Sequence, residues 1–236
     1  MTTAVAPNVI IVDYGAGNLR SVARAVQHAL NTSPSPAGEG RGGVDIADDP
    51  RALDGADALI VPGVGAAADT MRNLRQSRMV EPIRDYIASG RPFLGVCMGQ
   101  QALLSVSEEG GEHECLGIIP GRVKKLQAAL DAGLKVPHMG WNTVHQLPGP
   151  DGLHPIFDGI PDEAYFYFVH SYAPVPDDPA VVIGQTTYGD PDAGGTFASV
   201  LAKDNIVATQ FHPEKSAEHG LRMYANFLKG ASLRAN

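Results

Sequence analysis

One cysteine in this sequence has the neighbours that a catalytic nucleophile needs. Cys97 lies between Gly95 and Gly99, which gives the segment the form Gly-x-nucleophile-x-Gly. Residues 93–96 predict a strand, and a helix is expected to begin just after the cysteine. Such a sharp turn places the sulfur at a helix N-terminus, which favours a thiolate and leaves the N–H of Met98 available to an oxyanion. We predict that Cys97 is a nucleophile; a buried structural cysteine beside a glycine-rich turn is the alternative.

A base for this thiol is offered by the segment Gln210–Ser216, which reads Gln-Phe-His-Pro-Glu-Lys-Ser. Pro213 disfavours a helical conformation at His212, so the segment is expected to be extended. Residues two apart in an extended chain point the same way, so Glu214 can orient the imidazole of His212. Alone, His-Pro-Glu is more often a surface turn. Paired with the cysteine turn, it predicts a triad of Cys97, His212 and Glu214.

A glycine-rich segment follows a second predicted strand. Residues 58–61 are apolar, and Pro62 is followed by Gly63, Val64 and Gly65. Glycines let the backbone approach a ligand closely. A backbone N–H from this segment would complete an oxyanion hole with that of residue 98. Taken by itself, the segment reads as a plain turn.

The apolar runs predict the elements that hold these residues. In the first half of the chain, strands alternate with helices, which favours a parallel sheet covered on both faces. The strands are expected over 9–12, 58–61 and 93–96, and the helices over 19–30 and 80–89. The second half predicts strands joined by short turns and one late helix, hence a mixed sheet with an antiparallel section. These strands are expected over 116–123, 165–169, 197–201 and 206–210, and the helix near 221–228.

Length and composition favour one compact unit. The chain has 236 residues, of which 44% are hydrophobic and 19% charged, so we predict a single domain over residues 1–236. Residues 31–43 are rich in Pro, Gly and Ser and have no apolar period. This segment is expected to be a flexible surface loop that lies away from the chemistry.

Charge and motif content exclude several classes of protein. The net charge is −8 and no basic stripe is present, so a nucleic-acid partner is not expected. No apolar run is long enough to span a bilayer, and the first seven residues do not resemble a secretory signal, so a cytoplasmic location is expected. The two cysteines make no disulfide framework, and no metal-binding motif is present. We therefore expect no metal and no cofactor.

With these pieces in place, the chain resembles the class I glutamine amidotransferases. More narrowly, it is similar to the glutaminase subunits of imidazole glycerol phosphate synthase, an enzyme of histidine biosynthesis. The cysteine turn and His-Pro-Glu are features of the whole superfamily, whereas the narrower match rests on further blocks in the expected order. The blocks that carry the match are Asp13–Leu19, Pro62–Gly65, His138–Asn142, Tyr167–Tyr172 and Gln210–Ser216.

The resemblance implies a reaction and a fold, a flavodoxin-like three-layer α/β sandwich whose mixed sheet is mostly parallel with an antiparallel section. The nucleophile would attack the side-chain amide of glutamine, ammonia would leave, and water would release glutamate from the thioester. Gln101 and Glu109 match positions that hold the substrate glutamine. Ser171 and Tyr172 match positions whose backbone meets the substrate carboxylate. Gln100 stands where the family usually has Met, so the assignment of the neighbouring glutamine ligand could shift by one position.

The resemblance also implies a partner chain. One amidotransferase domain leaves no room for a synthase, and in the family the ammonia passes to a cyclase partner with a (β/α)8 barrel fold. Together they form a heterodimer that makes imidazole glycerol phosphate and aminoimidazole carboxamide ribotide. Asn18, Trp141, Asn142 and Tyr167 match positions near that interface. Without the resemblance, Trp141 is as readily a core residue, and Asn18 could simply cap a helix.

Three other functions remain open on the residues alone. A related amidotransferase could serve a different synthase, such as that for anthranilate or pyridoxal phosphate, but it should lack the narrower blocks. A cysteine hydrolase or chaperone of the same superfamily commonly has an acidic residue near the cysteine and a histidine just after the turn. Here Met98 follows the cysteine and the next histidine is His113. A non-catalytic binding protein is disfavoured by the intact set of Cys97, His212 and Glu214.

Overall fold

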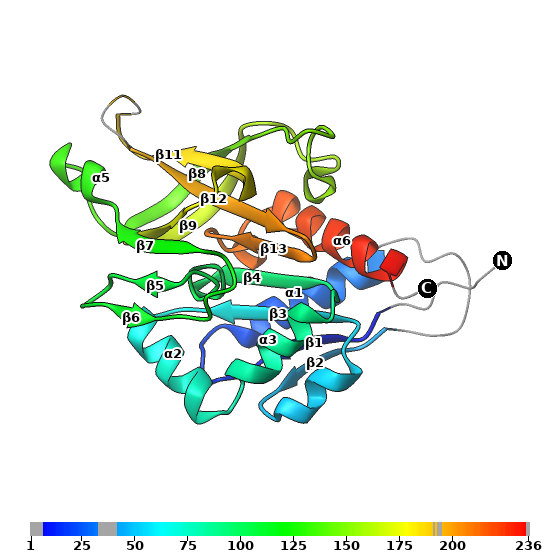
Figure 1. The fold of residues 1–236 in the computed structure, drawn as a ribbon. Helices are drawn as coiled ribbons and strands as arrows, with labels where there is room; N and C mark the ends of the chain where they lie inside the picture. The colour runs from blue at the N-terminus through cyan, green and yellow to red at the C-terminus, as the bar shows by residue number, and fades with distance from the viewer. Residues whose placement is uncertain (1–6, 33–41, 191, 193–194, 235–236) are drawn as a thin grey trace.

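The computed structural model describes residues 7–32, 42–190, 192 and 195–234, and its centre is a mixed nine-stranded sheet (Figure 1). One half of the sheet is parallel. Its strands are short, and all but the edge strand β2 are buried along their whole length, as expected for strands that are covered on both faces. In spatial order they are β2 (Val44–Ala47), β1 (Val9–Val12), β3 (Ala58–Gly63), β4 (Phe93–Cys97) and β13 (Ile206–Thr209).

The other half of the sheet is antiparallel and continues directly from β13. Each strand here pairs antiparallel with its neighbour. In spatial order the strands are β12 (Thr196–Lys203), β11 (Val182–Thr187), β8 (His138–Gln146) and β9 (Ala164–His170). The strand β13 therefore joins the two halves, with parallel β4 on one side and antiparallel β12 on the other.

A smaller sheet lies beside the large one (Figure 1). It has four strands, of which two are only two residues long. In spatial order they are β10 (Tyr172–Pro176), β7 (Gly121–Lys125), β5 (Val106–Ser107) and β6 (His113–Glu114). Because β10 begins two residues after β9 ends, the two sheets meet at residues 170–172.

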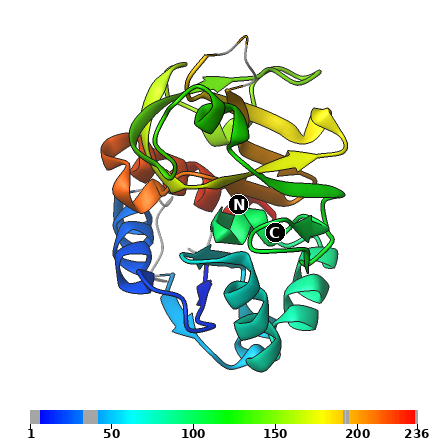
Figure 2. The same ribbon diagram turned by 90° about the vertical axis from the view of Figure 1, so that its left-hand side faces the viewer.

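Helices cover the two faces of the parallel half. Figure 2 shows α1 (blue) and α6 (red) on one side of the sheet and the teal helices α2 and α3 on the other. Their bounds are α1 (Leu19–Thr32), α6 (Ala217–Arg234), α2 (Ala67–Gln76) and α3 (Val80–Ala88). Two shorter helices follow β4 and β7, namely α4 (Met98–Gln101) and α5 (Gln127–Asp131).

Short 3-10 turns connect several of these elements. They are η1 (Pro50–Gly55), η2 (Pro155–Phe157), η3 (Pro179–Val181) and η4 (Pro213–Lys215). Among the described residues, none of the helices is both long and apolar enough to cross a membrane. The mixed sheet with helices on both faces confirms the predicted three-layer α/β arrangement.

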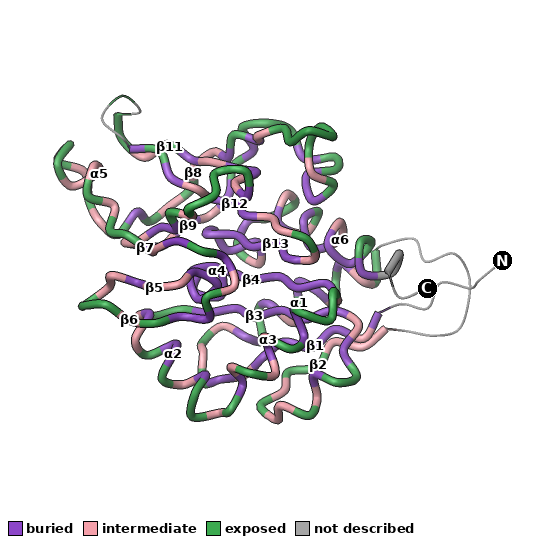
Figure 3. Tube along the Cα trace, viewed as in Figure 1, coloured by how far each residue is buried: buried purple, intermediate pink, exposed green. Residues whose placement is uncertain are grey.

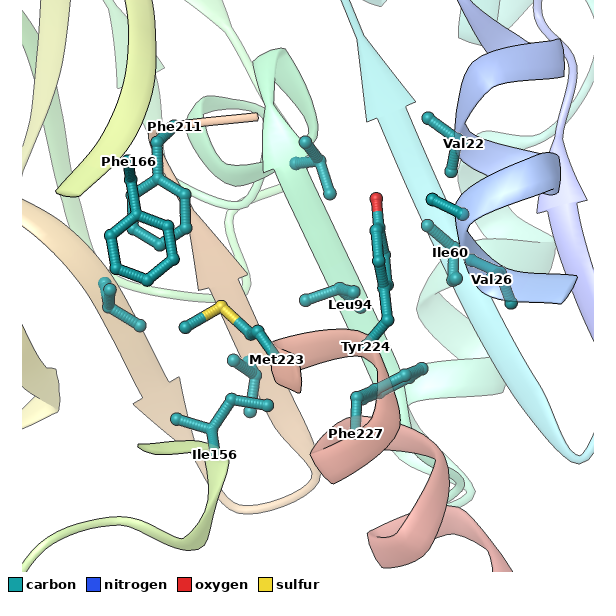
Figure 4. Close-up of a cluster of buried hydrophobic side chains, with 14 of the residues drawn as sticks. Val22, Val26, Ile60, Leu94, Ile156, Phe166, Phe211, Met223, Tyr224 and Phe227 are labelled. Atoms are coloured by element: carbon teal, nitrogen blue, oxygen red, sulfur yellow. The ribbon is translucent and has the colours of Figure 1, made fainter. Parts of the chain in front are cut away.

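The core consists of one hydrophobic cluster on each face of the sheet. Alternate residues of β1 contribute to the two clusters, because successive side chains of a strand point to opposite faces. Figure 3 shows burial running along the central strands, while the outer sides of the helices are exposed. In one cluster, Val22 and Val26 of α1 and Tyr224 of α6 pack over Ile60 and Leu94 of the sheet (Figure 4).

The structure corrects several predicted bounds. The strand expected over 116–123 is wrong in its first part, because β7 begins at Gly121 and the apolar residues before it fill the core from a loop. The strand over 58–61 continues through Gly63, which pairs with Cys97 of β4. Residues 31 and 32 of the predicted loop belong to the last turn of α1, and residues 33–41 lie outside the described residues. The strands β2, β5, β6, β8, β10 and β11 and the helices α2 and α5 have no counterpart in the prediction.

Candidate active site

Cys97 is the last residue of β4 and the residue that precedes α4. Its φ is 53° and its ψ is −104°, a conformation that non-glycine residues adopt only under strain. The two flanking glycines are required by contact. A Cβ at Gly95 would lie 2.7 Å from the carbonyl oxygen of Gly99, and a Cβ at Gly99 would overlap the carbonyl oxygen of Val61. The surrounding strands therefore hold the cysteine in its strained turn.

His212 follows the strand that lies beside β4. Because β13 and β4 are parallel, with Thr209 opposite Val96, both the cysteine and the histidine leave the same edge of the sheet. The backbone N–H of His212 donates to the carbonyl of Tyr167 at 3.0 Å. The segment that follows is the turn η4 rather than the extended segment predicted, although His212 itself is extended. This turn folds Glu214 back towards the ring.

The imidazole of His212 is fixed between a carboxylate and a thiol. Its Nδ1 lies 2.8 Å from Oε1 of Glu214, and the two side chains are 2% and 0% exposed. Its Nε2 is buried and makes no hydrogen bond of ordinary geometry with the described residues. Burial lowers the pKa of His212, but the neighbouring Cys97 and Glu214 outweigh this effect and raise it to about 10. A protonated imidazole beside the sulfur stabilises a thiolate.

Glu214 has a second donor on the oxygen that faces His212. Asn18 donates from Nδ2 to Oε1 of Glu214 at 2.6 Å, across 196 residues of sequence. The first turn of α1 meets the backbone of this residue, since the N–H groups of Ser21 and Val22 donate to the carbonyl of Asn18. The hydroxyl of Tyr224 also lies near this carboxylate, and Figure 4 shows it pointing away from α6. Burial, together with the nearby charge of Glu214, raises the pKa of Tyr224.

A cavity of about 250 Å³ opens beside Cys97 and His212. The structure brings most of the residues predicted for catalysis and substrate binding to its wall. Those that line it are Val64, Gly65, Met98, Gln101, Glu109, Ser171 and Tyr172. Gly63 lies just behind the wall, paired with Cys97, in a position where a Cβ would overlap the hydroxyl of Tyr14.

The two neighbouring glutamines differ in their contacts. Gln101 lines the cavity, and its Nε2 donates to the carbonyl of Tyr172 at 2.8 Å and to Oε1 of Gln210 at 2.9 Å. Gln100 is fully buried and its Nε2 donates to the carbonyl of Ala208 at 3.2 Å. Gln101 is therefore the one of the two that faces the site.

Gln210 is a site residue that the sequence prediction missed. It is fully buried, and its Nε2 lies 3.6 Å from the sulfur of Cys97. Its spacing from His212 could have indicated it, because residues two apart in an extended segment point the same way. Glu109 is held by a different contact, since its Oε2 accepts from the N–H of Ala67 at the start of α2, at 2.8 Å.

Two histidines near the cavity were also missed. His170 lines the cavity, and its Nε2 lies 3.2 Å from Nδ1 of His138. Both rings are buried, although histidines are usually found partly exposed. Their positions, 32 residues apart, give no signal of a contact until the pairing of β8 with β9 is known.

The residues predicted to face a partner divide into two groups. Trp141 is 52% exposed, so it is not a core residue, and its ring meets that of Tyr167 edge-on at 6.1 Å. Met139 and Tyr165 lie on the same side of the β8–β9 pair and are 63% and 58% exposed. We call these four residues the aromatic face. Asn142 points to the opposite side of the pair, where its Nδ2 donates to the carbonyl of Thr187 at 2.9 Å.

Comparison with known proteins places this geometry in a family. The model of the family "Glutamine amidotransferase class-I" matches residues 10–231. The imidazole glycerol phosphate synthase subunit HisH of Nitrosococcus oceani is 46% identical over 221 residues, which cover 94% of this chain and 96% of that protein. The protein of the same name from Herpetosiphon aurantiacus is 44% identical over 228 residues, covering 97% of each chain.

Solved structures agree on the fold. A structure described as a glutamine amidotransferase gives a TM-score of 0.63 at 18% identity, covering 95% of this chain and 99% of the other. The glutaminase domain of CTPS from Trypanosoma brucei gives a TM-score of 0.60 at 16% identity, covering 96% of this chain and 94% of that one. Since the family match spans the site and the relatives span nearly the whole chain, this chain belongs to the class I glutamine amidotransferases, among the HisH subunits of imidazole glycerol phosphate synthase.

Proposed function

We propose that this chain hydrolyses the side-chain amide of glutamine with Cys97, His212 and Glu214. The ammonia passes to a cyclase partner that makes imidazole glycerol phosphate and aminoimidazole carboxamide ribotide in histidine biosynthesis. The observation that carries the proposal is the strained Cys97 beside a buried His212–Glu214 pair, at the wall of a cavity of about 250 Å³. That volume is small for a ligand site and suits a single amino acid.

The first half of the reaction makes a thioester. The thiolate of Cys97 attacks the carboxamide carbon of glutamine, and the carbonyl oxygen becomes an oxyanion. The N–H of Met98 and an N–H from residues 63–65 stabilise that charge. His212 then gives a proton to the amide nitrogen, the C–N bond breaks and ammonia leaves. Glu214 holds the Nδ1–H side of the ring throughout, so Nε2 faces the reacting atoms.

The second half releases glutamate. His212, now neutral, takes a proton from a water molecule as that water attacks the thioester carbon. The second tetrahedral intermediate collapses, the C–S bond breaks, and Cys97 leaves as a thiolate beside a protonated His212. The ion pair that began the reaction is thereby restored, and no cofactor enters the balance.

Substrate recognition follows from the charges and backbone groups around the cavity. Free glutamine carries an ammonium and a carboxylate group, so each needs a partner. The carboxylate of Glu109 lines the cavity and suits the ammonium, and the backbone of Ser171 and Tyr172 suits the carboxylate. Gln101 offers an amide to hold the substrate. A cytoplasmic location fits a catalytic thiol that must stay reduced.

The deciding experiment replaces the nucleophile in the complex with its cyclase partner. We expect Cys97→Ala to lower the conversion of glutamine to glutamate by at least about 10³-fold, since removing a triad nucleophile has effects of this order or larger. Synthesis supplied with free ammonia should persist. Cys115→Ala is the matched control, because this second thiol is buried outside the cavity and should leave both activities unchanged. Loss of both activities in Cys97→Ala would contradict separate sites for glutamine and ammonia.

A further inference from the structure

Two buried histidines form a chain of contacts that ends in the substrate cavity. His138 of β8 lies opposite His170 of β9 in the strand register, and their ring nitrogens are 3.2 Å apart. The ring of Tyr188 stacks on His138 with centroids 4.1 Å apart and an interplanar angle of 24°. Both histidines are at most 6% exposed, so their polar atoms depend on protein partners.

Asn142 sets the direction of the chain because its amide can point only one way. Its Nδ2 faces the carbonyl of Thr187 at 2.9 Å, and its Oδ1 accepts from the backbone N–H of Thr143 at 2.8 Å. A flipped amide would place oxygen against oxygen and N–H against N–H. Since Nδ2 also lies 3.3 Å from Nε2 of His138, that ring nitrogen must accept.

The protonation of both rings follows from this first contact. If Nε2 of His138 accepts, its Nδ1 carries the proton and donates to Nε2 of His170. His170 then carries its proton on Nδ1, which donates to the carbonyl of Tyr172 at 2.9 Å. A second proton on either ring would place two N–H groups face to face. In agreement, burial lowers the pKa of His138 to about 4 and that of His170 to about 3.

The far end of the chain reaches the groups assigned to substrate and nucleophile. The carbonyl of Tyr172 that receives His170 also receives Nε2 of Gln101 at 2.8 Å. Gln101 bonds Gln210 at 2.9 Å, and Gln210 lies 3.6 Å from the sulfur of Cys97. Both nitrogens of His170 are occupied, so this ring cannot serve as the base, although it lines the cavity.

We infer that His138 and His170 are positioning residues, whose one-way donor chain from Asn142 to the Tyr172 carbonyl holds the glutamine-binding wall of the cavity in place. This role rests on the proposed function for its consequence, but not for its geometry. Without the donor from His138, Nε2 of His170 would be left unpaired and its ring would be free to turn, so Gln101 would remain the one fixed donor to the Tyr172 carbonyl. The position of that carbonyl and of the Gln101 amide would then be less well defined, and substrate binding would weaken more than the chemical step.

The geometry is tested first by nitrogen NMR of the imidazole rings in the full chain at pH 7. We expect both His138 and His170 to be neutral and protonated on Nδ1, the less common tautomer of free histidine. A proton on Nε2 of either ring, or a charged ring, would overturn the chain. No glutamine is involved, so this result is independent of the proposed activity.

The consequence is tested by glutaminase kinetics in the complex with the cyclase. His138→Phe should raise the KM for glutamine about tenfold, equivalent to about 1.4 kcal/mol, with a smaller change in kcat. His138→Asn keeps a donor near the former Nδ1 and should recover most of that loss. His145→Phe is the matched control, because His145 lies on the same strand but is exposed and paired with Asp162 and Glu163.

The outcomes test the positioning role of the histidines separately from the proposed function. An unchanged KM in folded His138→Phe, or a fall in kcat alone, overturns the positioning role. If His138→Phe does not fold, the KM of His138→Asn and the wild-type tautomers decide: a KM far above the wild-type value, or a proton on Nε2, overturns the role. An inactive wild-type complex contradicts the proposed function, and the tautomers still decide the geometry.

Discussion

In the proposed triad, the carboxylate of Glu214 is the group on which the base depends. It is buried at 0% side-chain exposure, and an isolated buried charge is costly unless its oxygens receive donors. His212 and Asn18 both meet Oε1, at 2.8 Å and 2.6 Å. Because Asn18 is neutral, it donates to Oε1 without competing for the charge of the imidazole, whereas Oε2 is buried without a hydrogen-bond partner among the described residues. The same residue was predicted to face a partner, so a contact at this position can reach the triad through one side chain.

Removing the amide of Asn18 should therefore slow the chemistry. Asn18 has a φ of 71°, which glycine adopts without strain, so Asn18→Gly removes only the donor. We expect kcat for glutamine hydrolysis to fall about tenfold, the value of one charge-assisted hydrogen bond, with little change in KM. Asp204→Gly is the control, since this exposed residue also has a positive φ of 53°. A higher KM with unchanged kcat would place Asn18 in substrate binding instead.

At the scale of elements, two neighbouring strands carry the proposed nucleophile and the proposed base. Parallel pairing of β4 with β13 brings Cys97 and His212 to one edge, and pairing of β3 with β4 brings Gly63 beside the cysteine. The carboxyl edge of a parallel sheet is the usual place for such groups. The close approach of α4 to β3 is what requires glycine at 99, so the shape of the turn is fixed by packing.

Two helix glycines should respond to alanine in opposite ways. Gly99→Ala would press a methyl group into the carbonyl of Val61, so we expect a loss of about 3 kcal/mol or more in the free energy of unfolding. Gly230→Ala in α6 meets nothing within 4 Å and should be neutral or stabilising by about 0.5–1 kcal/mol. Urea unfolding of the isolated chain measures both. Equal stability of the two variants would show that the turn can relax.

How far the sequence predicts this molecule also differs by element. The strands β1, β3, β4, β9, β12 and β13 are apolar enough to be located by pattern, and the Gly-x-Cys-x-Gly spacing indicates the turn. The strand β8 mixes polar and apolar residues, because it pairs near the edge of the sheet and carries His138, Trp141 and Asn142. Contacts such as Asn18 with Glu214 depend on strand order, which local spacing does not encode. The family blocks supply the cavity residues that local physics leaves open.

At the scale of the whole molecule, the aromatic face is the feature that a single chain leaves exposed to solvent. Its four side chains, Met139, Trp141, Tyr165 and Tyr167, lie together on the β8–β9 pair. The segment of the proposed triad is close, since Nζ of Lys215 lies 5.7 Å from the centre of the Tyr167 ring. Exposed clusters of large apolar groups mark interaction sites. Docking here would contact the strand that ends at the cavity.

Truncating the tryptophan should weaken the complex with the cyclase. Buried aromatic anchors cost about 2 kcal/mol or more when removed, so we expect Trp141→Ala to raise the Kd of the complex by about 30-fold. Titration calorimetry with the purified cyclase measures this. Leu153→Ala is the control, as this leucine is 53% exposed but lies in the loop between β8 and η2. An equal effect of the two variants would argue against a specific role for the aromatic face.

The single tryptophan of the chain lies on that face. Every photon of tryptophan emission from the isolated protein therefore comes from one half-exposed indole, with the phenol of Tyr167 beside it as an energy donor. The chain carries its own label at the place where a partner is expected to dock, and no dye needs to be attached. Buried tryptophans, whose emission would overlap that of an interface tryptophan, do not occur in this sequence, so the core emits only through tyrosine.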